Sequence, residues 1–184
     1  SFRAGAGSLI DTRNASITAT NGSIGSDAAA VNLLMSGALT ASATGGNVIA
    51  NQIAGAMKVN TVSASGAPDQ GQGKVVLSAQ DDIYGDAGHL ISGARIELSS
   101  VTGDIGGIAG HAGANLPLNV APGYTSDRSQ QHLYGVKASA AGDIGIDTVA
   151  SAGRNPDGHL LVDTIVSTGG DARVTAPGRI LDNN

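Results

Sequence analysis

The sequence predicts an all-β fold, a parallel β-helix in which the chain winds through short stacked strands. Three observations predict it. The composition favours turns, because Gly supplies 28 of 184 residues and Glu97 is the only glutamate among 15 acidic residues. A short motif recurs along the chain. Within each copy apolar and polar residues alternate, as in a strand buried on one face. The apolar residues are mostly Ala, Val, Ile and Leu, and aromatics are 2%, which suits a narrow interior.

The recurring motif is a short alternating run, a small polar turn, and Gly or Asp before an aliphatic residue. Its copies lie at Ala15–Gly25, Gly37–Ala50, Lys74–Gly85, Ala94–Gly107, Gly135–Asp147 and Asp171–Asp182. A second element separates them, at Ile10–Thr12, Val59–Gly66, Ile146–Gly153 and Val162–Gly170. Such self-similarity indicates a solenoid, in which each repeat buries its apolar strip only by stacking on its neighbours.

The period of the repeat is irregular. The residues before the recurring aliphatic position are Ser23, Asn47, Asp82, Asp104, Asp143 and Arg179, and their spacings are 24, 35, 22, 39 and 36. These spacings cluster near one or two multiples of about 20 residues, a solenoid coil length. We therefore expect about nine irregular coils of roughly 20 residues each.

The strands are expected where the alternation is clearest. In Ala15–Gly25, Ile17 and Ala19 point inward and Ser16 and Thr18 outward. One segment, Ser26–Gly37, also fits a short helix, with Ser26 as its N-cap and Gly37 after its last turn. Val31–Met35 equally fits the strand slot before the next repeat, so the segment has two possible structures.

We expect one continuous domain, with coils over residues 1–106 and 135–184. Glycine supplies the left-handed corners of such coils. The expected structural turn residues are Gly22, Gly46, Gly103, Asp104, Gly142, Asp143 and Gly178. Residues 107–134 form the least repetitive stretch, and we expect an insertion loop outside the helix there.

Charge and composition exclude several classes of protein. The net charge of −5 offers no basic footprint for nucleic acid. No stretch approaches 18 consecutive apolar residues, so we expect no membrane-spanning helix. The absence of cysteine excludes a disulfide framework and a thiolate metal site.

The repeats resemble those of a known family. Gly103–Gly106 and Gly142–Gly145 both read GDIG, and with the TATNGSIG and VTAPGRILDNN phrases they resemble filamentous-haemagglutinin-like repeat proteins, large bacterial adhesins exported by two-partner or type I secretion. The resemblance implies a single-stranded, right-handed parallel β-helix that forms part of a longer surface fibre. It also implies an extracellular location on a Gram-negative cell.

The insertion holds the candidate binding residues. Tyr124, Asp127, Arg128, His132 and Tyr134 combine aromatic and polar side chains, as surfaces that recognise a glycan or a protein do. The alternative is a solvated loop that caps an open edge of the helix.

Other candidate sites are a metal site and a catalytic site. Asp81, Asp82 and Asp86 form the densest acidic patch, where hard oxygen ligands for calcium stand at short spacing, or where Asp closes a turn through its own backbone. Calcium is the only cofactor that the sequence suggests. A polysaccharide-active enzyme would use His111 or His132 with Asp104 or Asp127 as general acid and base, but no catalytic motif accompanies them.

We expect a structural segment of an extracellular adhesin or fibre rather than an enzyme. Its expected partners are copies of itself or flanking repeats of the same chain. A solenoid end exposes unpaired strands, so such a segment can also stack into filaments. The alternative function is a glycan- or protein-binding module that uses residues 107–134.

Overall fold

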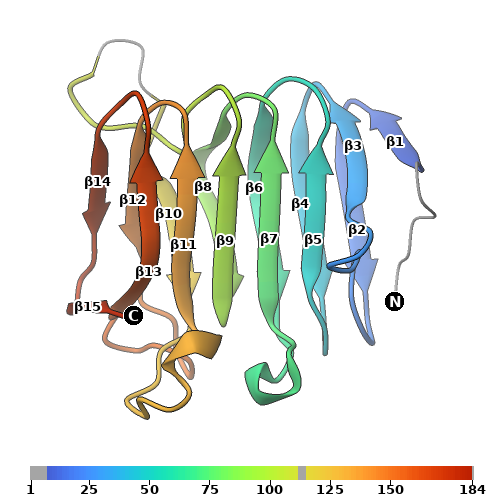
Figure 1. The fold of residues 1–184 in the computed structure, drawn as a ribbon. Helices are drawn as coiled ribbons and strands as arrows, with labels where there is room; N and C mark the ends of the chain where they lie inside the picture. The colour runs from blue at the N-terminus through green and yellow to red at the C-terminus, as the bar shows by residue number, and fades with distance from the viewer. Residues whose placement is uncertain (1–7, 112–114, 184) are drawn as a thin grey trace.

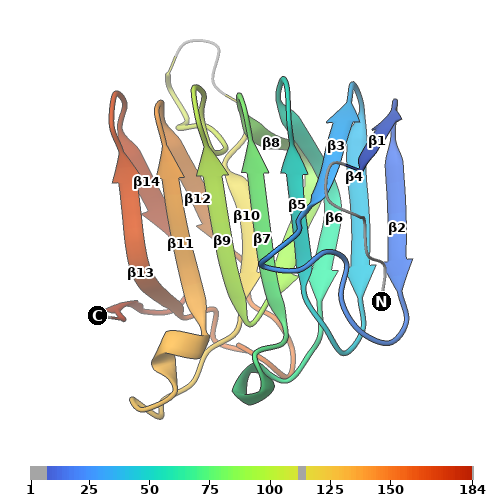
Figure 2. The same ribbon diagram turned by 45° about the vertical axis from the view of Figure 1, so that its right-hand side comes forward.

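The computed structural model describes residues 8–111 and 115–183, and within them the chain is all-β. Strand accounts for 54% of the residues and helix for 3%. The described residues form two sheets in which every strand pair is parallel, with the order β1-β3-β5-β7-β9-β11-β13-β15 in one and β14-β12-β10-β8-β6-β4-β2 in the other. The chain therefore alternates between the sheets, as Figures 1 and 2 show. The prediction of a parallel, solenoid-like β fold is confirmed.

The larger sheet contains β1 (Leu9–Thr12), β3 (Val31–Met35), β5 (Val48–Gln52), β7 (Lys74–Ala79), β9 (Arg95–Ser100), β11 (Gly135–Ala140), β13 (Leu160–Ser167) and β15 (Ile180–Asp182). The smaller contains β2 (Ala15–Ala19), β4 (Ala38–Ala43), β6 (Met57–Ala64), β8 (Ile83–Gly93), β10 (Leu118–Pro122), β12 (Ile144–Thr148) and β14 (Ala172–Thr175). The described part of the chain thus supplies eight levels to one sheet and seven to the other. The exact number of coils and their handedness remain predictions.

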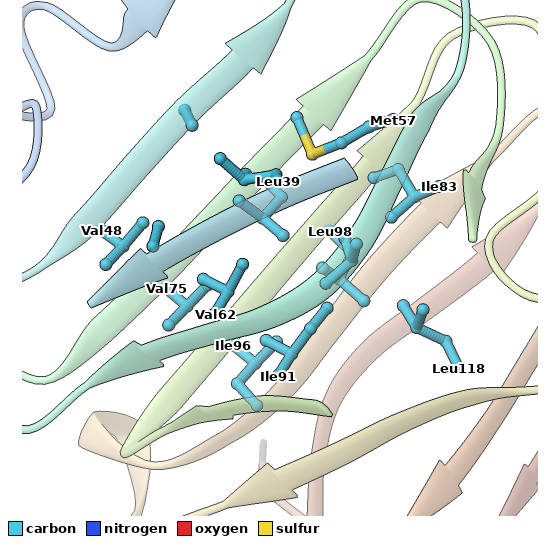
Figure 3. Close-up of a cluster of buried hydrophobic side chains, with 14 of the residues drawn as sticks. Leu39, Val48, Met57, Val62, Val75, Ile83, Ile91, Ile96, Leu98 and Leu118 are labelled. Atoms are coloured by element: carbon cyan, nitrogen blue, oxygen red, sulfur yellow. The ribbon is translucent and has the colours of Figure 1, made fainter. Parts of the chain in front are cut away.

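The core lies between the sheets and consists of stacked aliphatic side chains (Figure 3). In register, Val48 lies beside Val75 and Val75 beside Ile96, and all three are fully buried. Parallel pairing brings equivalent residues of successive coils together, so the period-two pattern of each strand becomes a continuous apolar ladder.

Residues Val31–Met35 form a strand, not the alternative helix. Val31, Leu33 and Met35 are buried, and β3 pairs with both β1 and β5. The strand is favoured over the helix because pairing on both sides satisfies the backbone hydrogen bonds of the segment and buries every second side chain.

Residues 107–134 do not form a single loop outside the helix, which corrects the expected domain boundaries. β10 lies inside this range and pairs with β8 and β12 in the smaller sheet. The chain leaves the coil twice: before β10 at one edge of the stack, and between β10 and β11 at the opposite edge, where the short 3-10 helix η2 (Gln131–Leu133) lies (Figure 1). Leu118 and Val120 are fully buried on either side of half-buried Asn119, the pattern of a strand.

The polar stretch between β6 and β7 is a loop that contains the 3-10 helix η1 (Pro68–Gln70). No helix within the described residues is long and apolar enough to cross a membrane.

Candidate functional site

The predicted Gly-Asp turns form a ladder of hydrogen bonds along one corner of the stack. The Asp82 carboxylate accepts the backbone N–H of Asp104 at 2.8 Å, Asp104 accepts that of Asp143 at 2.7 Å, and Asp143 accepts that of Asp171 at 2.8 Å. Each side chain thereby satisfies a backbone donor of the next coil. Hydrogen bonds of this kind to a charged acceptor are among the stronger ones in proteins.

The opposite corner uses the same device with other side chains. The Ser23 hydroxyl accepts the N–H of Asn47 at 2.9 Å, the Asn47 amide oxygen accepts that of Lys74 at 2.9 Å, and His159 Nδ1 accepts that of Arg179 at 2.9 Å. The motif therefore recurs at both corners of a coil. This explains the irregular spacing in the sequence, because the series from Ser23 to Arg179 combines positions from two different corners.

The predicted turn glycines are needed chiefly for close approach between coils. Of Gly22, Gly46, Gly103, Gly142 and Gly178, all within the described residues, only Gly22 has a positive φ (108°), which corrects the expectation of left-handed corners at the other four. A Cβ at Gly103 or Gly142 would instead lie within 3.0 Å of the carboxylate of the preceding ladder aspartate. Glycine precedes the aspartate because the preceding coil lies too close for a side chain.

The three aspartates of the candidate calcium site have separate partners. Asp82 belongs to the corner ladder, Asp81 Oδ1 accepts the hydroxyl of Thr102 at 2.7 Å, and Asp86 forms an ion pair with Lys58 at 2.6 Å. Among the described residues no group of three or more His, Cys, Asp or Glu side chains is placed to hold a metal ion. The alternative, in which Asp closes a turn through its own backbone, does not describe Asp81 and Asp82 either, because both carboxylates accept hydrogen bonds from the next coil.

His111 lies beside the aspartate ladder. Its Nδ1 is 2.6 Å from Asp143 Oδ2, and its Nε2 is 3.7 Å from Asp171 Oδ2. The general acid–base hypothesis paired His111 with Asp104 or Asp127. In the structure its carboxylate neighbours are instead Asp143 and Asp171. The Asp143 carboxylate also accepts the N–H of Asp171. Its contact with His111 therefore joins the segment before β10 to the corner ladder.

Acid should weaken this corner. The N–H of Asp171, followed by His111, lowers the pKa of Asp143. A carboxyl whose pKa is lower in the folded state stabilises the fold above its unfolded pKa of about 3.9, and this stabilisation is lost as the pH falls through the folded value. We expect the Asp143→Asn variant, which keeps an oxygen acceptor, to lose less stability than the parent between pH 5 and pH 2. The difference should stay below about 1 kcal/mol, because solvent near the carboxylate screens its interactions. Urea unfolding at each pH measures this, and identical pH profiles would contradict it.

The candidate binding residues that line a cavity lie in two neighbouring ones, a cleft and a smaller pocket. Tyr124, Arg128 and His132 line a cleft of about 550 Å³ together with Asp182 and Asn183 from the C-terminal segment. Tyr134 does not line this cleft but lies with Tyr124 in a smaller neighbouring pocket of about 180 Å³. The sequence thus identified three of the side chains that the structure brings together.

Asp127 is engaged within its own turn. Its carboxylate accepts the hydroxyl and the backbone N–H of Ser129, at 2.7 and 3.0 Å, and these hydrogen bonds lower its pKa. It therefore shapes the loop that carries Arg128 and does not line the cleft.

Several residues that sequence analysis did not single out position this loop. Arg95 on β9 donates from Nη1 to the backbone oxygen of His132 at 2.9 Å, and it also pairs with Glu97 and Asp163. Asn155, fully buried, donates to the oxygen of Pro122 at 3.2 Å and accepts the N–H of His159 at 2.8 Å. Most of these partners are 33 or more residues apart in the chain, so no local pattern identifies them.

Comparison with protein-family models, with curated proteins and with solved structures finds no match for this chain.

Proposed function

We propose that this chain is a structural segment of an extracellular bacterial adhesin or fibre, in which the solenoid acts as a stiff rod. The observation that carries the proposal is the continuity of the two sheets. Successive levels are hydrogen-bonded to one another on both sides of the core, and side chains at both corners add bonds between coils. At each level a load along the stack is therefore carried by the hydrogen bonds of one strand pair in each sheet and by the corner bonds.

The proposal includes a right-handed winding and about nine coils of roughly 20 residues. Connections that return to a parallel strand of the same sheet are right-handed in nearly all proteins, which supports the handedness. The role is structural and needs no catalysis. The resemblance of the GDIG turns to filamentous-haemagglutinin-like repeats supports an extracellular location on the bacterial cell surface.

The ends of the described stack favour another β-solenoid coil as partner. β1 and β15 each pair on one side within the described residues, and Leu9 and Ile180 on these strands are 44% and 52% exposed. A parallel strand laid on either edge would continue both the hydrogen-bond ladder and the apolar core. Flanking repeats or a second copy of the chain supply such a strand.

Cryo-electron microscopy of the purified chain tests the rod. We expect a reflection near 4.8 Å along the long axis, about the spacing of stacked parallel strands. Long filaments with this reflection would identify copies of the chain as the partner, and single short rods would identify flanking repeats. Compact particles without the reflection would refute the proposal. Labelling of intact cells of the source bacterium by an antibody against the chain would test the location.

A further inference from the structure

We propose that the cleft between the loop after β10 and the C-terminal segment binds a neutral saccharide. Its volume of about 550 Å³ lies within the range of small-molecule sites. Ligand binding at this one place on the surface does not depend on the mechanical role of the rod.

The aromatic wall of the cleft is held in a defined orientation. The ring of Tyr124 packs edge-to-face on His159, with ring centroids 4.7 Å apart and an interplanar angle of 66°. The His159 ring is itself fixed, because its Nδ1 accepts the backbone N–H of Arg179. A positioned ring with an apolar face and a hydroxyl suits the C–H face and the hydroxyl groups of a sugar.

The other walls are tethered from two sides. Arg95 on β9 holds the backbone of His132, and Asn183 Nδ2 donates to the backbone oxygens of Gln131 and Tyr134 at 3.0 and 3.2 Å. The cleft is therefore fixed by hydrogen bonds before a ligand enters, which reduces the entropy lost on binding.

The cleft offers both donors and acceptors. Arg128 is exposed and has no ion-pair or hydrogen-bond partner within the described residues, so its guanidinium is a free donor. The Asp182 carboxylate lines the same cleft. The Asn183 amide serves the wall itself, because its nitrogen donates to two backbone oxygens of the loop and its Oδ1 is buried out of reach of a ligand.

This mixture selects hydroxyl groups over anions. A hydroxyl both donates and accepts, so a sugar can accept from Arg128 and donate to Asp182. A carboxylate, sulfate or phosphate only accepts, so it cannot donate to the Asp182 carboxylate and would be repelled by it. The neutral ligand satisfies more of the groups that the cleft presents.

The test is a solution titration of the whole chain with neutral oligosaccharides of hexose and N-acetylhexosamine, beside sialylated and sulfated counterparts of the same length. The chain has three tyrosines and no tryptophan, so isothermal titration calorimetry measures the affinity of every variant, and the loss of the tyrosine fluorescence change in Tyr124→Ala assigns that signal to Tyr124. We expect at least one neutral oligosaccharide to bind with millimolar or better affinity. Tyr124→Ala should weaken it about tenfold or more, and Arg128→Ala and Asp182→Asn about threefold or more.

Matched controls separate the site from the fold. Arg173→Ala removes an exposed arginine on β14 outside the cleft and should leave the affinity unchanged. Circular dichroism verifies that each variant is folded. Tyr124→Ala loses the contact with His159 and can fail to fold; Arg128→Ala, at an exposed position, then still tests the cleft. Absence of binding by every neutral oligosaccharide would overturn the proposal. So would binding of acidic oligosaccharides alone, or neutral binding unchanged in Arg128→Ala and Asp182→Asn.

Discussion

Replacing Ile105 with alanine should lower the free energy of unfolding by about 2 to 5 kcal/mol, the range for large-to-small changes in a core. Ile105 is fully buried and forms parallel bridges to Ile83 and to Ile144. It continues the apolar ladder at the level where the chain leaves the coil before β10. The loss of its side chain therefore opens a cavity between the coils above and below it.

Urea unfolding followed by circular dichroism measures the effect of Ile105→Ala. The matched control is Val101→Ala in the preceding turn, where the side chain is 60% exposed and the change should stay within about 0.5 kcal/mol. A loss below about 1 kcal/mol for Ile105→Ala would mean that the ladder at this level contributes little to the stack.

Replacing Gly142 with alanine should cost about 3 kcal/mol, at the upper end of the range for overpacking. Its φ is not positive, so the alanine backbone itself is unstrained. The added Cβ would lie within 3.0 Å of the Asp104 carboxylate, the group that accepts the Asp143 N–H. The methyl group must displace that carboxylate and break the ladder, or push the coils apart.

A double-mutant cycle with Asp104→Ala identifies the cause. If the carboxylate is the obstacle, Gly142→Ala should cost at least about 1 kcal/mol less in the Asp104→Ala background than in the parent chain. Equal costs in both backgrounds would place the strain elsewhere in the turn. Chemical denaturation of the four proteins at pH 7 supplies the comparison.

Much of the fold was predictable because parallel stacking repeats a local pattern. The strand Ala15–Ala19 alternates buried and exposed residues as expected from Ile17 and Ala19, and the Gly-Asp pairs at Gly103 and Gly142 do form turns between strands. The role of those glycines was not predictable, since it depends on the distance to the preceding coil. The extent of the insertion was missed because Leu118–Pro122 carries no copy of the recurring Gly-Asp motif and its clear alternation covers only Leu118, Asn119 and Val120.

The candidate site was predictable only in part. Tyr124, Arg128 and His132 stood out as aromatic and charged residues in a non-repetitive segment, and they share one cleft. The C-terminal wall, Asp182 and Asn183, lies far along the chain, as the spacing of 52 between Gln131 and Asn183 records. Asp81, Asp82 and Asp86 are close in sequence, yet each carboxylate meets a different partner.

The amino-acid order alone was enough to predict a stack of short parallel strands, because residue alternation, small aliphatic side chains and recurring Gly-Asp turns act within a single coil. The folded molecule was needed to establish which corner each turn occupies, which glycines meet a carboxylate, and which side chains face one another across the cleft. These contacts join residues one or more coils apart. Because the coil lengths are irregular, the residues that lie side by side on successive coils are known only once the strands are paired.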